Sequence, residues 1–223
     1  MVYTIGVHES SNAFINIKQV KLYMNNTKNI TKRQQQAAES RKRIFDSAMK
    51  LINNKGFENV SISDICKSAK CSVGTFYHYF PSKDDLIMSA YKDADREEAE
   101  IIEQNSCGGD FREQILYIFK VQSEIACKMG VEFMTQIYKN QITIENHFLF
   151  DKDRTMPNHL CAIIEKTQAD GLLTTEYSAD SIVNELQKFS RGIFYDWCAH
   201  KGSYNHTESM IKSMNIFITA FCK

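Results

Sequence analysis

Proline is nearly absent from this sequence of 223 residues, which contains only two. Proline interrupts helices, so its scarcity, together with a 43% share of hydrophobic residues, favours a mostly helical globular protein. No apolar run approaches the roughly 20 residues that a membrane-spanning helix needs. Residues 1 to 30 also lack the basic start and continuous apolar core of a secretory signal peptide. We therefore expect a soluble, cytoplasmic protein.

The sequence also lacks the motifs that mark the common catalytic and metal sites. GxSxG, HExxH, P-loop and dinucleotide-binding patterns are all absent. Seven cysteines are scattered along the chain, with no CxxC pair and no His residues at zinc-ligand spacing. We expect no enzyme activity, no cofactor and no metal, and free thiols in a reducing compartment. A redox-active cysteine is the alternative to thiols that are simply buried.

Charge is unevenly distributed, although the net charge is zero. Between residues 28 and 83 there are eleven Lys and Arg residues but only four Asp and Glu residues, and the rest of the chain balances this surplus. The asymmetry indicates a basic module for an anionic partner and an acidic body. Taken alone, the run Arg41-Lys42-Arg43 would indicate no more than a solvated helix face.

Apolar spacing predicts two helices within this basic region. The first covers 32–54, with Gly56 as its terminator, and the second begins at the capping pattern Ser61-Ile-Ser-Asp64. After a short break at 70–73 a third helix begins. Residues 1 to 30 show no sustained period, so we expect little structure there, and Met24 is an alternative start residue.

The stretch CSVGTFYHYFPSKDDL, residues 71 to 86, crowds four aromatic side chains into positions 76 to 80. In a helix, Phe76 and Phe80 share one face, whereas Thr75, Tyr77 and Tyr79 spread around the rest. One core cannot bury them all, so we expect the two Phe rings to point inward and the hydroxyls to meet a partner. Two short helices joined by a tight turn are typical of helix-turn-helix proteins, which insert a recognition helix into the major groove.

The run from Ala48 to Leu86 resembles the tetracycline-repressor (TetR) family of bacterial regulators. The resemblance is clearest in Gly56-Phe57, Ser61-Ile-Ser-Asp-Ile65 and Val73-Gly-Thr-Phe-Tyr-His-Tyr-Phe-Pro-Ser-Lys83. It implies an all-α fold, with a disordered lead at 1–30, a three-helix DNA-binding domain at 31–83 and a helical ligand-binding and dimerisation domain at 84–223. It also implies a repressor that binds palindromic operator DNA as a homodimer and is released by a small-molecule effector.

The family's DNA-contacting positions can be placed on this sequence. They fall on Ser61, Ser63, Val73, Gly74, Thr75, Tyr77 and Tyr79, with Lys83 on the phosphate backbone. Val73 stands where the family is often polar or basic, and it can meet a thymine methyl but cannot hydrogen-bond a guanine. Tyr79 stands where the family commonly has His, and we favour it over the adjacent His78 for the backbone contact.

Glycine and proline breaks divide the rest of the chain into helices near 82–105, 110–129, 131–147, 156–170, 178–201 and 206–221. Aromatic and Met residues between 115 and 150 are either plain core or, as the resemblance implies, in part a ligand cavity. The cavity candidates are Phe119, Phe133, Met134, Tyr138 and Phe148. Their composition favours an apolar or aromatic effector.

Apolar stripes in the last two helices fit a four-helix dimer interface, as the resemblance implies. The candidates are Phe194, Trp197, Met214, Phe217 and Phe221. A helical lipid or drug carrier without DNA binding is the alternative function. It would account for the aromatic body but would leave the basic module and its tyrosines unexplained.

Overall fold

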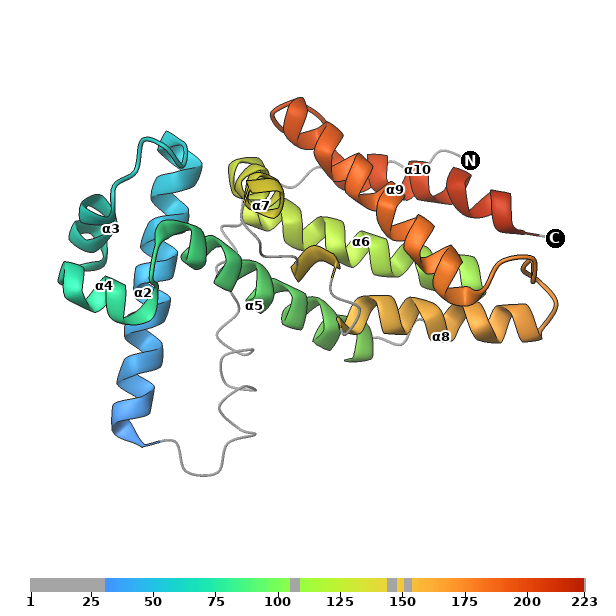
Figure 1. The fold of residues 1–223 in the computed structure, drawn as a ribbon, viewed down its shortest axis with the longest axis horizontal. Coiled ribbons are helices and arrows are strands. Elements are labelled where there is room, and N and C mark those ends of the chain that lie inside the picture. Colours follow the sequence, from blue (N-terminus) through green and yellow to red (C-terminus); the bar gives the residue numbers. More distant parts are fainter. Residues whose placement is uncertain (1–30, 105–108, 144–147, 151–153, 223) are drawn as a thin grey trace, which may run out of the picture. The chain divides into compact units, whose positions relative to one another are not determined.

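Helices account for most of the residues that the structure, a computed structural model, describes: 31–104, 109–143, 148–150 and 154–222 (Figure 1). The predictions for residues 1–30 lie outside these ranges. The chain divides into two compact units, one ending at Lys42 and one beginning at Arg43. In the first unit the described residues are the start of α2 (Lys32–Lys55), where Gln34 N–H donates to Thr31 Oγ1 and Thr31 N–H donates back to Gln34 Oε1.

The rest of α2 belongs to the second unit, where it buries an apolar face formed by Ile44, Ala48 and Ile52. Gly56 ends the helix with a φ of +82°, in the left-handed region that glycine tolerates. The predicted capping box at the start of α3 (Ile62–Ala69) is confirmed, since the Ser61 and Asp64 side chains each bond to the other's backbone N–H.

The third helix, α4 (Val73–Tyr79), is capped at its N-terminus by Ser72, whose Oγ accepts the Thr75 N–H at 3.0 Å. The prediction that Phe76 and Phe80 point inward is confirmed, because both rings are buried with their centroids 5.8 Å apart. Burying each ring contributes roughly 1.5–3 kcal/mol, so this pair fixes which side of the short helix faces outward.

The C-terminal body begins with α5 (Lys83–Gln104), whose start is capped by Ser82 as predicted, with the Asp85 N–H donating to Ser82 Oγ at 3.0 Å. The remaining predicted helices are also present, although the segment expected to be helical to 147 is helical to Thr143, with 144–147 outside the described residues. The elements are α6 (Phe111–Met129), α7 (Val131–Thr143), η1 (Phe148–Phe150), α8 (Thr155–Ala169), α9 (Ala179–Ala199), α10 (His206–Ile218) and η2 (Thr219–Phe221). Of the two short 3₁₀ segments, η1 was not predicted, whereas η2 falls within the segment 206–221 that was expected to be helical.

In this body α6, α8, α9 and α10 lie side by side, with α10 packed against both α6 and α9 (Figure 1). Helix α5 contacts α6, α7 and α8. Near the chain end, the Thr174 N–H donates to the Phe221 carbonyl at 3.0 Å. Within the described ranges, no helix has both the length and the hydropathy needed to cross a membrane.

A buried polar cluster joins α6 to the start of α10. Ser123 Oγ lies 2.7 Å from His206 Nδ1 and 2.9 Å from Thr207 Oγ1. The His206 ring stacks on Phe194 of α9, with centroids 4.4 Å apart. Burial lowers the pKa of His206 to about 4, so the imidazole is neutral at physiological pH.

Candidate functional site

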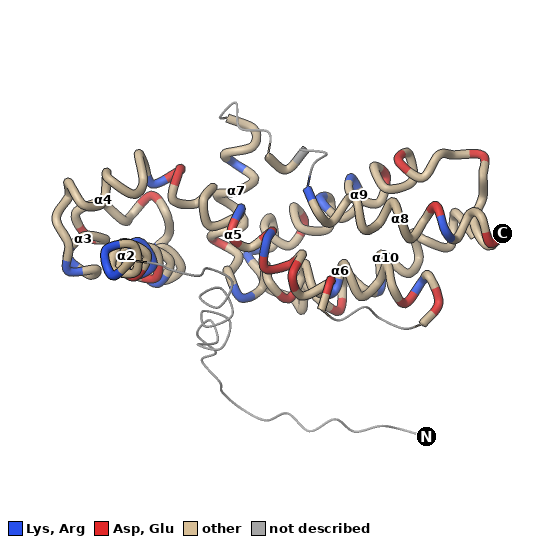
Figure 2. Tube along the Cα trace, turned by 90° about the horizontal axis from the view of Figure 1, so that it is seen from below, with Lys and Arg blue, Asp and Glu red and all other residues tan. Residues whose placement is uncertain are grey.

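The outward side of α4 carries neutral side chains. Val73 and Tyr77 are 47% and 50% exposed, and Gly74 is exposed between them. No Lys, Arg, Asp or Glu occurs in this helix, which Figure 2 shows in the neutral colour along its length. Helix α3, which contacts α4, supplies positive charge through Lys67 and, at its C-cap, Lys70. The two helices together present apolar, hydroxyl and cationic groups.

Other predicted contact residues on α4 are partly committed to the fold. Thr75 is partly buried, and its Oγ1 lies 2.8 Å from Ser72 Oγ, which caps the helix. Tyr79 is also partly buried and meets the neighbouring His78 edge-on, with ring centroids 4.9 Å apart. Tyr77 thus presents more of its side chain than either residue.

Two further predicted contact residues support the turn before α3. Lys83 Nζ donates to the carbonyls of Phe57 and Val60 at 2.8 and 2.7 Å and lies 4.2 Å from the centre of the Phe57 ring. Of its three N–H donors, two are used in these bonds. Ser61 is occupied by the capping box, whereas Ser63 is exposed.

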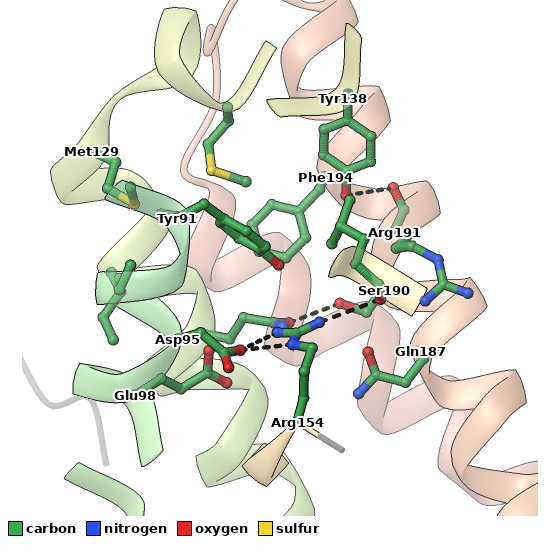
Figure 3. Close-up of a pocket in the computed structure, with 16 residues that line it drawn as sticks. Tyr91, Asp95, Glu98, Met129, Tyr138, Arg154, Gln187, Ser190, Arg191 and Phe194 are labelled. Carbon is green, nitrogen blue, oxygen red and sulfur yellow. Dashed lines mark hydrogen bonds and ion pairs between the residues drawn. The ribbon is translucent and has the colours of Figure 1, made fainter. Parts of the chain in front are cut away.

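A small cavity lies within the C-terminal body, with a volume of about 30 Å³ (Figure 3). That volume is about the size of one water molecule. Side chains from α5, α6, α7 and α9 line it, together with Leu149 and with Arg154, which lies just before α8. The other lining residues are Tyr91, Ala94, Asp95, Glu98, Gln122, Ile125, Ala126, Met129, Met134, Tyr138, Gln187, Ser190, Arg191 and Phe194.

The cavity wall contains buried charge. Arg154 forms an ion pair with Asp95, with side-chain exposures of 3% and 9%. The Arg154 Nε donates to Asp95 Oδ1 at 2.7 Å, and the guanidinium lies 5.6 Å from the centre of the Tyr91 ring. The pKa of Arg154 is raised by the Tyr91, Asp95 and Glu98 oxygens, against the effect of burial, so it stays charged.

Glu98 is buried in the same wall, and its Oε1 has no hydrogen-bond partner among the described residues. Burial raises the pKa of Glu98 to about 8, with a further increase from Asp95, while Arg154 acts in the opposite direction. Glu98 is therefore mostly protonated at neutral pH. An unsatisfied buried carboxyl group lowers stability, and such groups are often kept for a ligand.

Of the five predicted ligand residues, two line the cavity. Met134 and Tyr138 are in its wall, and the Tyr138 hydroxyl donates to the Arg191 carbonyl at 3.3 Å. Phe148 lies next to the wall, where it packs edge-on against Tyr91 with ring centroids 5.7 Å apart. Phe119 and Phe133 are fully buried in the core and do not line the cavity.

The polar lining was not predicted. For Glu98 a signal existed: Ile87, Tyr91, Ala94 and Ile102 recur at helical spacing, and Glu98 falls on that apolar face of α5. An acidic residue on a face destined for burial indicates a specific partner or function. For Arg154, no comparable periodic pattern marks the position.

Hydrogen bonds from Asn53 and Phe57 join the helix-turn-helix region to the junction between α6 and α7. Asn53 Nδ2 donates to the Met129 carbonyl at 3.0 Å, and the Phe57 N–H donates to Glu132 Oε1 at 3.1 Å. Between these acceptors lies Gly130, with a φ of +93°, and a Cβ at this position would lie 2.8 Å from Asn53 Oδ1. Since the Met129 side chain lines the cavity, its carbonyl connects the cavity wall directly to α2.

The predicted dimer residues differ in burial within the subunit. Phe194, Trp197 and Met214 are buried, whereas Phe217 and Phe221 are partly exposed. Phe217 stacks on Phe189 of α9 with centroids 4.3 Å apart, along an open groove between α9 and α10. On the same two helices, Tyr195 of α9 and Ile216 of α10 are 63% and 67% exposed.

Comparison with known proteins shows that the N-terminal region is similar to bacterial transcriptional regulators. A family profile described as "Bacterial regulatory proteins, tetR family" matches residues 44–90. Over 51 residues the chain is 45% identical to the uncharacterized HTH-type transcriptional regulator YuxN of Bacillus subtilis (strain 168), covering 23% of this chain and 18% of that protein. The matched region spans only 18% to 29% of the length of such curated relatives. These relatives are described as regulators, not enzymes.

Solved structures share the fold over about four fifths of this chain. One is Thermus thermophilus FadR, a TetR family transcriptional repressor in complex with lauroyl-CoA, with a TM-score of 0.58 and 21% identity over 80% of this chain and 93% of that one. Another is a transcriptional regulator from Saccharomonospora viridis in complex with choline, with a TM-score of 0.65 and 20% identity over 83% of this chain and 99% of that one. The profile match and the curated regulators agree that residues 44–90 match the tetR family of bacterial regulatory proteins, and the solved structures show that the chain shares the all-α fold of such regulators.

Proposed function

We propose that this chain is a transcriptional repressor that binds palindromic operator DNA as a homodimer and releases it when a small molecule enters the cavity. The observation that carries the proposal is the exposed face of α4, held outward by two buried Phe rings within a helix-turn-helix of the family. FadR of Thermus thermophilus is described as a repressor, which favours repression over activation here.

The groups on this face suit DNA in distinct ways. Val73 and Gly74, at the start of α4, allow close apolar approach to base edges, including a thymine methyl. The hydroxyls of Ser63, Tyr77 and Thr75 can donate to phosphate oxygens, and Tyr79 can do so after a small rotation. Lys83 can reach a phosphate with its remaining N–H while it holds the turn before α3.

Replacing Tyr77 by Phe is expected to weaken operator binding by roughly 1.5–3 kcal/mol, because it removes a hydrogen bond to a charged phosphate. The ring is 50% exposed, so the fold should be unaffected. Fluorescence anisotropy at fixed salt, with a DNA palindrome selected by the protein from random sequence, measures the change.

The matched control is Tyr177→Phe, which removes a hydroxyl from an equally exposed ring in the turn before α9 and should leave affinity unchanged. Equal affinities for the two variants would exclude Tyr77 from the contact surface. A failure to select any DNA would instead favour a helical carrier that does not bind DNA.

We place the dimer interface on the groove between α9 and α10. Phe217 and Phe221 are partly exposed there, and the exposed Tyr195 and Ile216 extend the same surface. Phe194, Trp197 and Met214 then support this surface from within the subunit. Apolar side chains gathered on two adjacent helices fit an interface between two copies related by a two-fold axis.

The double variant Tyr195→Glu, Ile216→Glu is expected to be monomeric at micromolar concentration, because charge on the exposed apolar surface of α9 and α10 opposes association. Both side chains are exposed, so the subunit should remain folded. Size-exclusion chromatography with light scattering gives the mass, and circular dichroism reports folding. Ile142→Glu, at an 82% exposed position on α7, is the control and should stay dimeric. A monomeric wild-type protein would contradict the proposal.

We assign effector control to the junction between α6 and α7. A ligand that displaces the Met129 or Met134 side chain also shifts the backbone that accepts the hydrogen bond from Asn53. The bond from the Phe57 N–H to Glu132 would move with it. Since the cavity holds about 30 Å³ and ordinary ligand pockets have roughly 300–1,000 Å³, entry of an effector must enlarge the cavity.

A further inference from the structure

One buried acceptor in the cavity wall has no hydrogen-bond donor among the described residues. Arg154 donates to Asp95, and the Ser190 hydroxyl donates to Gln122 Oε1 at 2.9 Å, so these donors already have partners. Glu98 Oε1, buried in the same wall, has no partner among the described residues. No described donor reaches this carboxyl oxygen, and a ligand that supplies N–H groups would provide one.

We propose that the cavity binds the ammonium group of a primary organic amine, with Glu98 as its anionic partner. This inference rests on the proposed role of the cavity as the effector site. It narrows the effector to a cationic amine with a hydrocarbon body, within the apolar or aromatic class that the sequence favours.

The size and walls of the cavity fit an –NH₃⁺ group. A volume of about 30 Å³ holds one water-sized group, and a trimethylammonium group is several times larger. The rings of Tyr91, Tyr138 and Phe194 surround the space, and aromatic rings attract cations (Figure 3). The hydrocarbon part of the amine would displace flexible side chains, for which Met129 and Met134 are suited.

An anionic ligand fits less well. The Arg154 guanidinium is already neutralised by Asp95. Figure 3 shows the Arg191 guanidinium on the opposite side of the cavity from Glu98. A carboxylate ligand would therefore meet the Asp95 carboxylate, whose guanidinium partner is already engaged, and repulsion between these two like charges would oppose its entry.

The proton on Glu98 links amine binding to pH. The charged or titratable groups around this carboxyl group are Tyr91 and Asp95 on α5, Tyr138 on α7, Arg154 before α8 and Arg191 on α9. Since the pKa of Glu98 is raised to about 8, the O–H bond must ionise when the ammonium enters, and the proton passes to solvent. As the pH rises toward 8, the affinity for the amine should therefore increase about tenfold per pH unit. Above pH 8 it should level off.

The test uses isothermal titration calorimetry with n-butylammonium, n-hexylammonium and n-octylammonium chlorides, and with octanol and octanoate as neutral and anionic probes. We expect the ammonium ions alone to bind, more tightly as the chain lengthens. Glu98→Gln should weaken octylammonium binding at least tenfold and abolish its pH dependence. Glu100→Gln, which neutralises an exposed acid on the same helix, should change neither.

Three results would overturn the inference: no binding by any of the three ammonium ions, equal binding of octanol or octanoate, or octylammonium binding that is unchanged in Glu98→Gln. The same protein samples are assayed for operator binding without amine. Normal operator binding combined with any of these results rejects the amine and leaves the proposed function intact. Loss of operator binding in the wild-type protein would reject the proposed function itself, whatever the calorimetry gives.

Discussion

Replacing Arg154 by Met is expected to lower the free energy of unfolding by roughly 3–5 kcal/mol, the usual effect of removing one partner from a buried ion pair. The variant leaves the Asp95 carboxylate buried without its cation, close to Glu98. It also removes the guanidinium that packs near the rings of Tyr91 and Phe148, 5.6 and 5.5 Å from their centres. Urea denaturation followed by circular dichroism measures the change.

Lys120→Met is the matched control, because Lys120 pairs with Glu124 at 3.8 Å on the surface, with side-chain exposures of 47% and 49%. Breaking such a pair changes stability by about 1 kcal/mol or less. Adding Asp95→Asn to Arg154→Met should restore part of the loss, since it removes the uncompensated charge. A similar decrease in the free energy of unfolding in Arg154→Met and in the surface-lysine control would show that the buried pair has no special role.

Acidification is expected to destabilise the folded protein through His206. The pKa of this imidazole is about 4 in the folded state and 6.5 in its ordinary environment, because burial disfavours the imidazolium. Between these values the unfolded chain binds the extra proton, so stability is complete above pH 6.5 and declines as the pH falls toward 4. The full loss amounts to roughly 3 kcal/mol.

His206→Asn removes the titrating group and keeps a polar partner for Ser123. Whatever its stability at neutral pH, its unfolding free energy should fall less between pH 6.5 and 4 than that of the wild-type protein. Thr207→Val, which removes only the neighbouring hydroxyl, should lower stability by the same amount at each pH. Parallel pH profiles for wild type and His206→Asn would refute the assignment.

The helix-turn-helix was predictable because its determinants are local in sequence. Ser61 and Asp64 cap α3 from three residues apart, and Phe76 and Phe80 meet one turn apart on α4. Such contacts depend only on helical geometry, which apolar spacing and capping residues encode. The ends of most helices followed from the same signals, with Gly56 as the clearest terminator.

The buried ion pair in the cavity wall could not be predicted, because it depends on two distant residues meeting. Arg154 and Asp95 are 59 positions apart, and no pattern in either segment indicates that the two residues form a pair. Likewise, a stripe of large apolar residues in the sequence does not indicate which of them are buried within the subunit and which remain exposed on its surface. Phe194 and Met214 are buried within the subunit while Phe217 is partly exposed, a division set by how α6, α9 and α10 pack.

The small volume of the cavity has a kinetic consequence. Since about 30 Å³ cannot admit a molecule larger than its head group, an effector must wait for the wall to open before it enters. At high ligand concentration the observed association rate would then reach a plateau equal to the opening rate instead of rising in proportion. The response time of the regulator would be set by motion of its own side chains and would stay the same however abruptly the effector accumulates.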